Sequence, residues 1–473
     1  MKTKATKLTA LLLCLIMLMS VPFAAFAAGN EVSRVAVTIN GDSANARGIS
    51  WYTDEECDSV VQLAKAGEDI ENGTLVRGEG YKAMKKYVHK VTLIGLEPAT
   101  KYAYRVGDGN IWSEVGYFTT SNPADDKVDF IVTADVQASN DENFKKAADV
   151  MKKAVETMPE HDFITTLGDF VNDCTNEEWD SYFKNFAFAN SNTTIVPVAG
   201  NHEGNLQWNK FNNIFNIGAA KGSMTTTGCY YSFDWGDAHF AVLNSNDMYP
   251  MSQQQLNWLK NDMRASDAQW KIILMHRALY SAGKNINKPD TIIMREVLLP
   301  VVDELGIDIV FAGHDHMYFR TKQVKGDEVQ LCQSVTEVYE GEETSFMLNP
   351  EGTIHILPST TGTKRYGVNE DAIPPILQCG DVVRDTKTGG CFATVSIDSE
   401  HFVYKAYIVD DETGEKELID SYAIKKTMKE QQKDYLTLPT DPILTLPGNI
   451  VNFAVQLIKM IFTYLFELLP AVI

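Results

Sequence analysis

Five apolar runs in this chain each end in a residue that can bind a metal ion, and this pattern constrains the fold more than any other feature. Short apolar runs bounded by turn residues are typical of buried strands. In open α/β sheets, binding sites form at the carboxyl ends of the strands. The residues that follow the runs 129–134, 163–168, 195–200, 272–275 and 307–313 are Asp135, Asp169, Asn201 with His202, His276, and His314 with His316. The pattern predicts one cleft that holds two metal ions.

The length and charge of the chain narrow its class. Its 473 residues predict two or three domains. A formal net charge of -21 argues against nucleic acid as the main partner, because phosphate backbones attract basic surfaces. A local positive metal site can still bind a small phosphorylated substrate.

The first 27 residues have the pattern of a signal peptide. Three lysines precede the apolar stretch 8–21, and Ala25 and Ala27 are small residues at a cleavage point. We therefore leave residues 1–27 out of the fold and expect a secreted or extracytoplasmic protein. An exported chain permits disulfides, and Cys379 with Cys391 is the favoured pair, with buried free thiols as the alternative.

Residues 31–122 predict an all-β module. Val35, Val37 and Ile39 are large apolar residues at alternate positions, which is typical of a half-buried strand. The segment 96–102, Leu-Glu-Pro-Ala-Thr-Lys-Tyr, resembles a corner of fibronectin type III domains, in which the tyrosine hydroxyl anchors a crossover between sheets. We expect a fibronectin III-like sandwich here.

Residues 127–425 predict an α/β domain, because strand-like and helix-like segments alternate. Apolar residues between Phe144 and Met158 follow helical spacing, and residues 252–264 and 290–305 predict further helices.

The tail, residues 427–473, differs from the rest. Its first half is polar, and residues 450–473 are apolar except for one narrow stripe of Asn452, Gln456, Lys459, Thr463 and Glu467. Charges near its centre disfavour a membrane span. We expect an amphipathic helix that lies on a membrane surface. Packing on the protein itself, oligomer contact and a true span remain alternatives.

The motifs as a set resemble those of the calcineurin-like metallophosphoesterases, and the N-terminal module resembles that of purple acid phosphatases. The likeness covers residues 31–425 and implies a four-layer (αββα) α/β domain behind the sandwich. The matching blocks, in chain order, are Asp135-x-Gln137, Gly168-Asp169, Gly200-Asn201-His202-Glu203, Met275-His276-Arg277 and Gly313-His314-Asp315-His316.

The resemblance also implies a role for each motif residue. Asp169 would bridge the two ions, Asp135 and His316 would complete the first site, and Asn201, His276 and His314 would complete the second. His202 would lie near the leaving group or the phosphate as an acid or hydrogen-bond donor. Glu203 would orient that histidine.

Bound metals lower the pKa of a coordinated water, so the implied reaction is in-line attack of a metal-bound hydroxide on phosphorus. Arg277 and Arg320 are candidate anion contacts, and Tyr280 is a candidate substrate contact.

Two positions depart from the family pattern. Purple acid phosphatases have Gly-Asp-x-x-Tyr, whose tyrosinate holds ferric iron, and here Asn172 takes the place of that tyrosine. We therefore expect no purple colour. Gln137 stands where many relatives have a histidine ligand, and it is either a weak ligand or a partner of one. The expected cofactors are two divalent or mixed-valence ions of Fe, Zn or Mn.

Phosphomonoester hydrolysis is the predicted activity. A phosphodiesterase that uses the same site is one alternative. A surface binding protein that keeps the fold without catalysis is another, although every ligand position besides Gln137 and Asn172 holds a competent donor.

Overall fold

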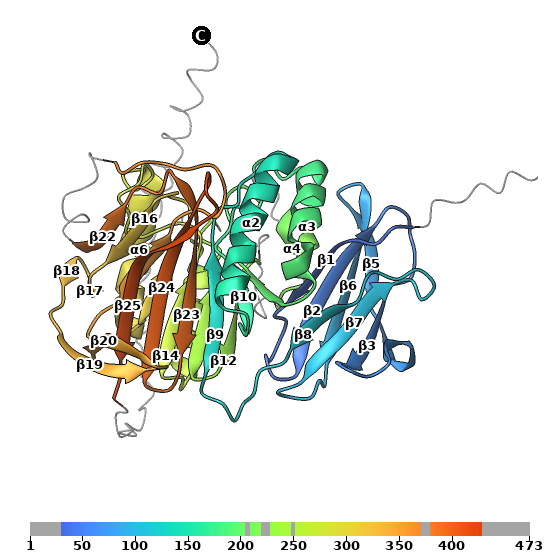
Figure 1. Ribbon diagram of the computed structural model, residues 1–473, viewed down its shortest axis with the longest axis horizontal. Helices are drawn as coiled ribbons and strands as arrows, with labels where there is room; N and C mark the ends of the chain where they lie inside the picture. Colours follow the sequence, from blue (N-terminus) through green and yellow to red (C-terminus); the bar gives the residue numbers. More distant parts are fainter. Residues whose placement is uncertain (1–29, 204–208, 219–227, 247–250, 370–378, 428–473) are drawn as a thin grey trace, which may run out of the picture. The chain divides into compact units, whose positions relative to one another are not determined.

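The computed structural model describes residues 30–203, 209–218, 228–246, 251–369 and 379–427 (Figure 1). By its internal contacts the chain divides into Met1–Met428 and Lys429–Ile473, and the description below concerns the first unit. The expected signal peptide and the expected amphipathic tail from residue 428 onward lie outside the described residues. Among the helices described, none combines the length and apolar character needed to cross a membrane.

The N-terminal module is a sandwich of two antiparallel sheets, as predicted. One sheet of the sandwich has the strand order β4 (Thr74–Arg77), β3 (Val60–Lys65), β7 (Lys101–Gly107) and β8 (Gly116–Thr119). The other consists of β1 (Ser33–Thr38), β2 (Ala46–Thr53), β6 (Lys86–Ile94) and β5 (Glu79–Ala83). A short 3-10 helix, η1, covers Ile70–Asn72.

The core of this sandwich contains Val37, one of the residues whose alternation predicts a strand. Val37, Trp51 and Tyr104 pack in one buried cluster. The tyrosine corner is present, because the hydroxyl of Tyr102 accepts a hydrogen bond of 2.8 Å from the backbone N–H of Glu97. The fibronectin-like corner therefore fixes the crossover between the two sheets.

The sandwich shares a sheet with the α/β domain. The end of β1 pairs with β11 (Thr194–Pro197) in parallel, with Thr38 opposite Ile195. The guanidinium of the buried Arg47 crosses the same junction and donates 3.0 Å to Thr194 Oγ1 and 2.6 Å to the carbonyl of Thr119. The result is one twelve-stranded sheet, which the alternation of single strands does not predict.

Two sheets form the middle of the α/β domain. In sheet order, the remaining strands of the twelve-stranded sheet are β19 (Gln333–Tyr339), β20 (Glu342–Leu348), β25 (Lys416–Lys425), β24 (His401–Asp410), β23 (Gly389–Ile397), β9 (Val128–Thr133) and β10 (Phe163–Thr166). The seven-stranded sheet has the order β12 (Tyr231–Trp235), β13 (Ala238–Val242), β14 (Trp270–Leu274), β15 (Ile309–Phe311), β21 (Ile354–Pro358), β16 (Tyr318–Thr321) and β22 (Gly380–Arg384). A small hairpin joins β17 (Val324–Lys325) and β18 (Glu328–Val329).

Aromatic side chains fill the space between these two sheets. The Phe130 ring of β9 lies edge-on to Phe240 of β13 and to Phe311 of β15, at centroid distances of 5.5 and 6.3 Å. Such edge-to-face pairs add to the stabilisation that buried apolar area supplies. The two sheets therefore share one apolar core.

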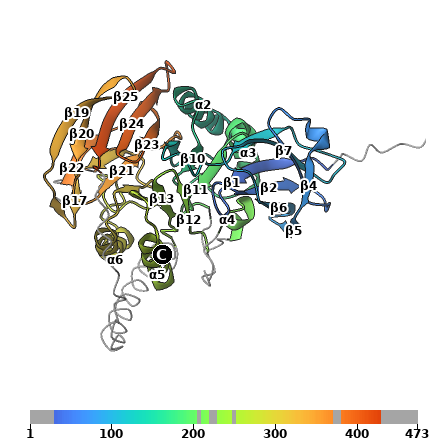
Figure 2. The ribbon, with the colours of Figure 1, turned by 90° about the horizontal axis from the view of Figure 1, so that it is seen from below.

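Helices cover the two outer faces. In Figure 2, α2 (Asp141–Thr157) and α3 (Asn176–Asn190) lie on the opposite side of the sheets from α5 (Gln253–Ala265) and α6 (Pro289–Leu305). A shorter helix, α4, covers Asn209–Ile214. This is the predicted four-layer αββα arrangement.

The helix boundaries follow from capping chemistry. Asn140 caps α2 through the N–H of Asn143, and α3 begins with a capping box between Thr175 and Glu178. Gly306 ends α6 in the left-handed conformation that glycine adopts without strain.

The favoured disulfide between Cys379 and Cys391 is wrong, because both residues are free thiols. Cys391 lies in β23 of the large sheet, whereas Cys379 directly precedes β22 of the other sheet and its thiol contacts the carbonyl of Asp327 at 3.5 Å.

Candidate metal centre

The predicted ligands follow strands that end at the same edge. The strands β9, β10 and β11 run parallel in one sheet, and β13, β14 and β15 run parallel in the other. Asp135, Asp169 and Asn201 follow the first three strands, and His276 and His314 follow β14 and β15. Parallel strands place their carboxyl ends together, so the two sheets present these side chains to one cleft.

The side chains form two groups that share one carboxylate. Asp135, Asp169 and His316 form one group, and Asp169, His276 and His314 form the other. Within each group the candidate ligand atoms lie within 4.8 Å of one another. Asp169 therefore stands where a bridging carboxylate would stand. The assignment of each residue to a particular ion remains a prediction.

Backbone carbonyls fix the orientation of two of these histidines. His276 Nδ1 lies 2.8 Å from the carbonyl of Leu167, and His316 Nδ1 donates to the carbonyl of Lys364. The Nε2 atoms then face carboxylates, at 3.3 Å from Asp169 Oδ2 for His276 and at 3.3 Å from Asp135 Oδ1 for His316. The lone pair of a histidine Nε2 and a carboxylate oxygen repel each other unless a positive charge lies between them. The donor set therefore fits metal ions.

The remaining members of the second group converge on the same point. Asn201 Oδ1 lies 3.0 Å and His314 Nδ1 lies 3.2 Å from His276 Nε2. The backbone N–H of His314 donates to both oxygens of Asp135, at 3.0 and 2.9 Å. These two hydrogen bonds join a ligand of one group, Asp135, to the main chain of a ligand of the other group, His314.

Electrostatics also favour a cation here. Burial opposes a charge on His276, but Asp169 outweighs burial and raises the pKa of His276 to about 9. Burial and then the charge of Arg277 hold the pKa of His314 well below its ordinary value, so that this histidine is neutral and able to bind a metal. Although burial would raise the pKa of Asp169, the nearby His276 holds it below its ordinary value. The bridging candidate is therefore an ionised carboxylate.

The backbone at the site is strained. Asp135, Asp169 and His314 have φ of 50°, 53° and 73°, in the left-handed region that residues other than glycine rarely adopt. Gly168 shows why space is tight, because a Cβ there would lie 2.6 Å from His276 Nδ1. Strain of this kind is typical of positions held for function.

Glu203 has a different role from the expected one. Its side chain is fully buried, and its two oxygens accept hydrogen bonds from the N–H groups of Asp169, Phe170 and Gly200 at 2.9, 2.7 and 2.7 Å. Burial and then the charge of Asp169 raise the pKa of Glu203 to about 8. Glu203 therefore clamps the loops that carry the ligands and does not orient His202.

His202 is oriented by other groups. Its Nδ1 hydrogen-bonds the backbone carbonyl of Asn172, and its Nε2 lies 2.5 Å from Gln137 Nε2. The backbone N–H of His202 also donates to Asp169 Oδ1 at 2.9 Å. The side chain of Asn172 donates to Asp173 at 3.0 Å. Of the two departures, Gln137 therefore contacts the predicted acid directly, and Asn172 acts through its main chain.

Three other expected contacts need correction or refinement. Arg277 Nη1 lies 3.4 Å from His314 Nε2 and is held by Asp290, so it positions a ligand and is not itself part of the cleft wall. The hydroxyl of Tyr280 donates to the carbonyl of Gly326 at 2.5 Å, which turns it away from the cleft. Arg320 is buried in ion pairs with Asp420 and Asp381 between strands.

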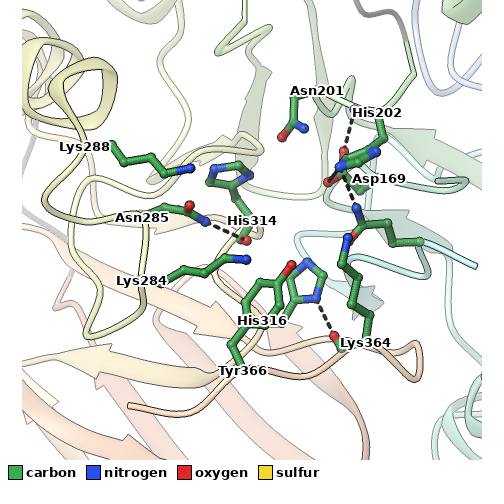
Figure 3. Close-up of a pocket in the computed structure, with 11 residues that line it drawn as sticks. Asp169, Asn201, His202, Lys284, Asn285, Lys288, His314, His316, Lys364 and Tyr366 are labelled. Atoms are coloured by element: carbon green, nitrogen blue, oxygen red, sulfur yellow. Dashed lines mark hydrogen bonds and ion pairs between the residues drawn. The ribbon is translucent and has the colours of Figure 1, made fainter. Parts of the chain in front are cut away.

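The cleft has a cavity volume of about 180 Å³. Sequence reasoning missed five of its residues, because they come from loops without a motif. Figure 3 shows the full set around the opening, and the lining residues are Gln137, Asp169, Asn201, His202, Lys284, Asn285, Lys288, His314, His316, Lys364 and Tyr366. Lys284 and Lys288 stand close together before a predicted helix in a chain of net charge -21, and this local positive charge is the signal that could have indicated part of the cleft wall.

Comparison with known proteins agrees with this geometry. Residues 128–318 match the family of calcineurin-like phosphoesterases, and residues 32–120 match the purple acid phosphatase N-terminal domain. Acid phosphatase type 7 of Danio rerio is 22% identical over 445 residues, which cover 85% of this chain and 93% of that protein. A purple acid phosphatase of Glycine max is 26% identical over 307 residues, which cover 58% of this chain and 62% of that protein.

Solved structures share the fold. A purple acid phosphatase from yellow lupin superposes with a TM-score of 0.67 at 16% identity, covering 84% of this chain and 75% of the lupin chain. The structure of PhoD gives a TM-score of 0.62 at 13% identity, covering 84% of this chain and 92% of PhoD.

The chain thus contains a calcineurin-like phosphoesterase domain, and it is a metal-dependent phosphoric ester hydrolase. Its N-terminal domain is of the purple acid phosphatase type, and its relatives include proteins named purple acid phosphatase. The family uses a dinuclear metal centre and acts on small phosphorylated substrates.

Proposed function

We propose that this protein is an exported phosphatase that hydrolyses phosphomonoesters at a two-metal site. The observation that carries the proposal is the pair of ligand groups that share Asp169. In each group a histidine Nε2 faces a carboxylate oxygen at 3.3 Å. Asp135, Asp169 and His316 would hold one ion, and Asp169, Asn201, His276 and His314 would hold the other.

When bound, two such ions supply positive charge for the phosphoryl group and acidify a water molecule. Carboxylate, amide and imidazole donors suit Fe, Zn and Mn. Position 172 holds an asparagine, whose side chain is hydrogen-bonded to Asp173, so it offers no phenolate to hold ferric iron. We therefore propose a colourless centre of divalent ions.

His202 is the proposed acid. Because the Nδ1–H of His202 is held by the carbonyl of Asn172, the doubly protonated ring would pass the proton on Nε2 to the leaving oxygen. Gln137 contacts that atom and would keep the ring aimed at the cleft. Glu203 keeps the main chain of the ligand loops in place and holds no substrate.

The size of the cleft favours monoesters over diesters. Its volume of about 180 Å³ is below the roughly 300–1,000 Å³ of pockets that take drug-sized ligands. A phosphodiester needs room for a second ester group beside the phosphorus.

The test is turnover of p-nitrophenyl phosphate and bis(p-nitrophenyl) phosphate by the mature chain, after chelation and after addition of Mn²⁺ or Zn²⁺. We expect metal-dependent hydrolysis that prefers the monoester and that Asp169→Asn abolishes. Preference for the diester would instead establish the phosphodiesterase. Stoichiometric metal binding without turnover of either ester would establish a silent binding protein.

We also propose export followed by contact of the tail with a membrane surface. The N-terminal pattern of residues 1–27 and the polar stripe of residues 450–473 support this. Mass spectrometry of the mature N-terminus tests the first part. Co-sedimentation with anionic lipid vesicles, with and without residues 428–473, tests the second, and equal sedimentation of both forms would refute it.

A further inference from the structure

Three lysines converge on the cleft from two segments of the chain. Lys284 and Lys288 belong to the loop before α6, and Lys364 belongs to the loop after β21. We call them the cleft lysines. In Figure 3 the side chains of Lys284 and Lys288 extend into the cleft from one side and that of Lys364 from the other.

A stack of rings holds one of these cations beside a predicted metal ligand. The ammonium of Lys284 lies 3.5 Å above the ring centroid of Tyr366, which is a cation–π contact. The Tyr366 ring in turn stacks on His316, with centroids 4.4 Å apart and planes inclined by 17°. Lys284 is therefore placed by the same wall that carries His316.

The cleft lysines are not neutralised by the protein. Within the described ranges, no carboxylate forms an ion pair with any of them. Among the described residues that line the cleft, Asp169 is the only carboxylate, and it is directed to the histidines. Burial, and then the repulsion of Lys288 and of Lys364, lower the pKa of Lys284.

The position of Lys288 adds to this excess of positive charge. Lys288 is the N-cap of α6, has no side-chain capping bond, and precedes Pro289. Helix N-termini carry a partial positive charge, and Asp, Ser, Thr or Asn is preferred there. A lysine at this position is unfavourable for the helix alone and becomes favourable when an anion binds against it.

From this we propose that the cleft lysines bind a second anionic group of the substrate, so that the preferred substrates are small molecules with two phosphate groups. This rests on the proposed phosphatase function. The metal ligands at the floor of the cleft suffice for the phosphoryl group that is hydrolysed. A second phosphate on the leaving group would neutralise the ammonium groups on the walls through charge-assisted hydrogen bonds.

The experiment compares two substrates that differ by one phosphate, 1,3-propanediol monophosphate and 1,3-propanediol bisphosphate. We would measure kcat/KM for both with the metal-loaded mature chain and divide the value for the bisphosphate by two for its equivalent esters. The ratio is expected to exceed about tenfold, since one charge-assisted hydrogen bond contributes at least that factor. It should fall as salt is added, because exposed charges are screened.

The variants are Lys284→Gln with Lys288→Gln, and Lys364→Gln separately. We expect each to reduce the ratio at least several-fold, because kcat/KM for the bisphosphate should fall more than kcat/KM for the monophosphate. Lys145→Gln is the matched control, because Lys145 is an exposed lysine on α2 and outside the cleft, and it should leave the ratio unchanged.

Two outcomes would overturn the inference without touching the proposed function. The wild-type ratio could be close to one, or the variants could lower kcat/KM for both substrates equally, which would mean that the lysines only attract phosphate in general. Absence of metal-dependent monophosphate turnover in the wild type would instead refute the proposed function itself.

Discussion

Replacing Glu203 by glutamine distinguishes a clamp of the backbone from a partner of His202. Oε2 accepts from the N–H groups of Asp169 and Gly200, and Oε1 accepts from that of Phe170. A glutamine that keeps the first two bonds directs its NH₂ group at the third N–H. We therefore expect Glu203→Gln to lower the free energy of unfolding by about 1–3 kcal/mol, the cost of leaving one buried N–H group without an acceptor.

Alanine at the same position is a stronger perturbation. It leaves three buried N–H groups without an acceptor, which costs about 3–9 kcal/mol at about 1–3 kcal/mol each. That loss is comparable with the total stability of about 5–15 kcal/mol of a typical protein. We expect Glu203→Ala to fail to accumulate as a folded protein, so glutamine is the informative change.

The assay is urea unfolding followed by tryptophan fluorescence, with Glu177→Gln as the control, because Glu177 is exposed on α3. The pH dependence of kcat is measured on the folded variant. This pH profile should keep the wild-type shape, since Asn172 and Gln137 hold the ring of His202. Unchanged stability together with a shifted pH profile would refute the clamp and restore the expected pairing of Glu203 with His202.

Three further predictions concern other parts of the molecule. Burial raises the pKa of Asp162 from 3.8 to about 7. The folded state therefore favours the protonated carboxyl, so the contribution of Asp162 to the free energy of unfolding is fully present below pH 3.8 and is lost as pH rises to about 7. Asp162→Asn should therefore stabilise the protein increasingly over that range, by up to about 4 kcal/mol at 1.36 kcal/mol per pKa unit, and equal melting temperatures at pH 8 would contradict this. Tyr102→Phe removes the partner of the Glu97 N–H and should lower the unfolding free energy by about 1 kcal/mol in urea titrations, whereas no change would mean that the corner is not stabilising. Asp169→Asn should reduce bound metal, measured by elemental analysis, while Asp173→Asn, an exposed neighbour, should not; retention of both ions by the first variant would exclude a bridging role.

The parts of the site that sequence predicts are those fixed locally. Asp135, Asp169 and His276 each follow an apolar strand directly, so strand recognition alone places them at one edge. Gln137 and His202 are likewise within a few residues of a strand end. Their mutual contact could not be predicted, because it depends on how two loops fold against each other.

The parts that sequence misses depend on distant segments. The acceptor role of Glu203 needs N–H groups from the distant loop after β10, and local reasoning instead pairs Glu203 with its neighbour His202. Lys364 and Lys284 come from different loops and line the same cleft only when the strands of the seven-stranded sheet have paired. The positions of Tyr280 and Arg320 cannot be predicted for the reverse reason, because their partners, in a distant turn and a distant strand, hold them away from the cleft.

The pairing of β1 with β11 has a consequence for how the chain is made. β1 leaves the ribosome well before β11, and until β11 exists one end of β1 lacks its neighbour and Arg47 lacks Thr194. Pairings between segments so far apart form slowly, because the intervening loop must be closed first. The module that is synthesised first is therefore completed only after part of the second has been made, and the order of synthesis is not the order in which the two modules reach their final form.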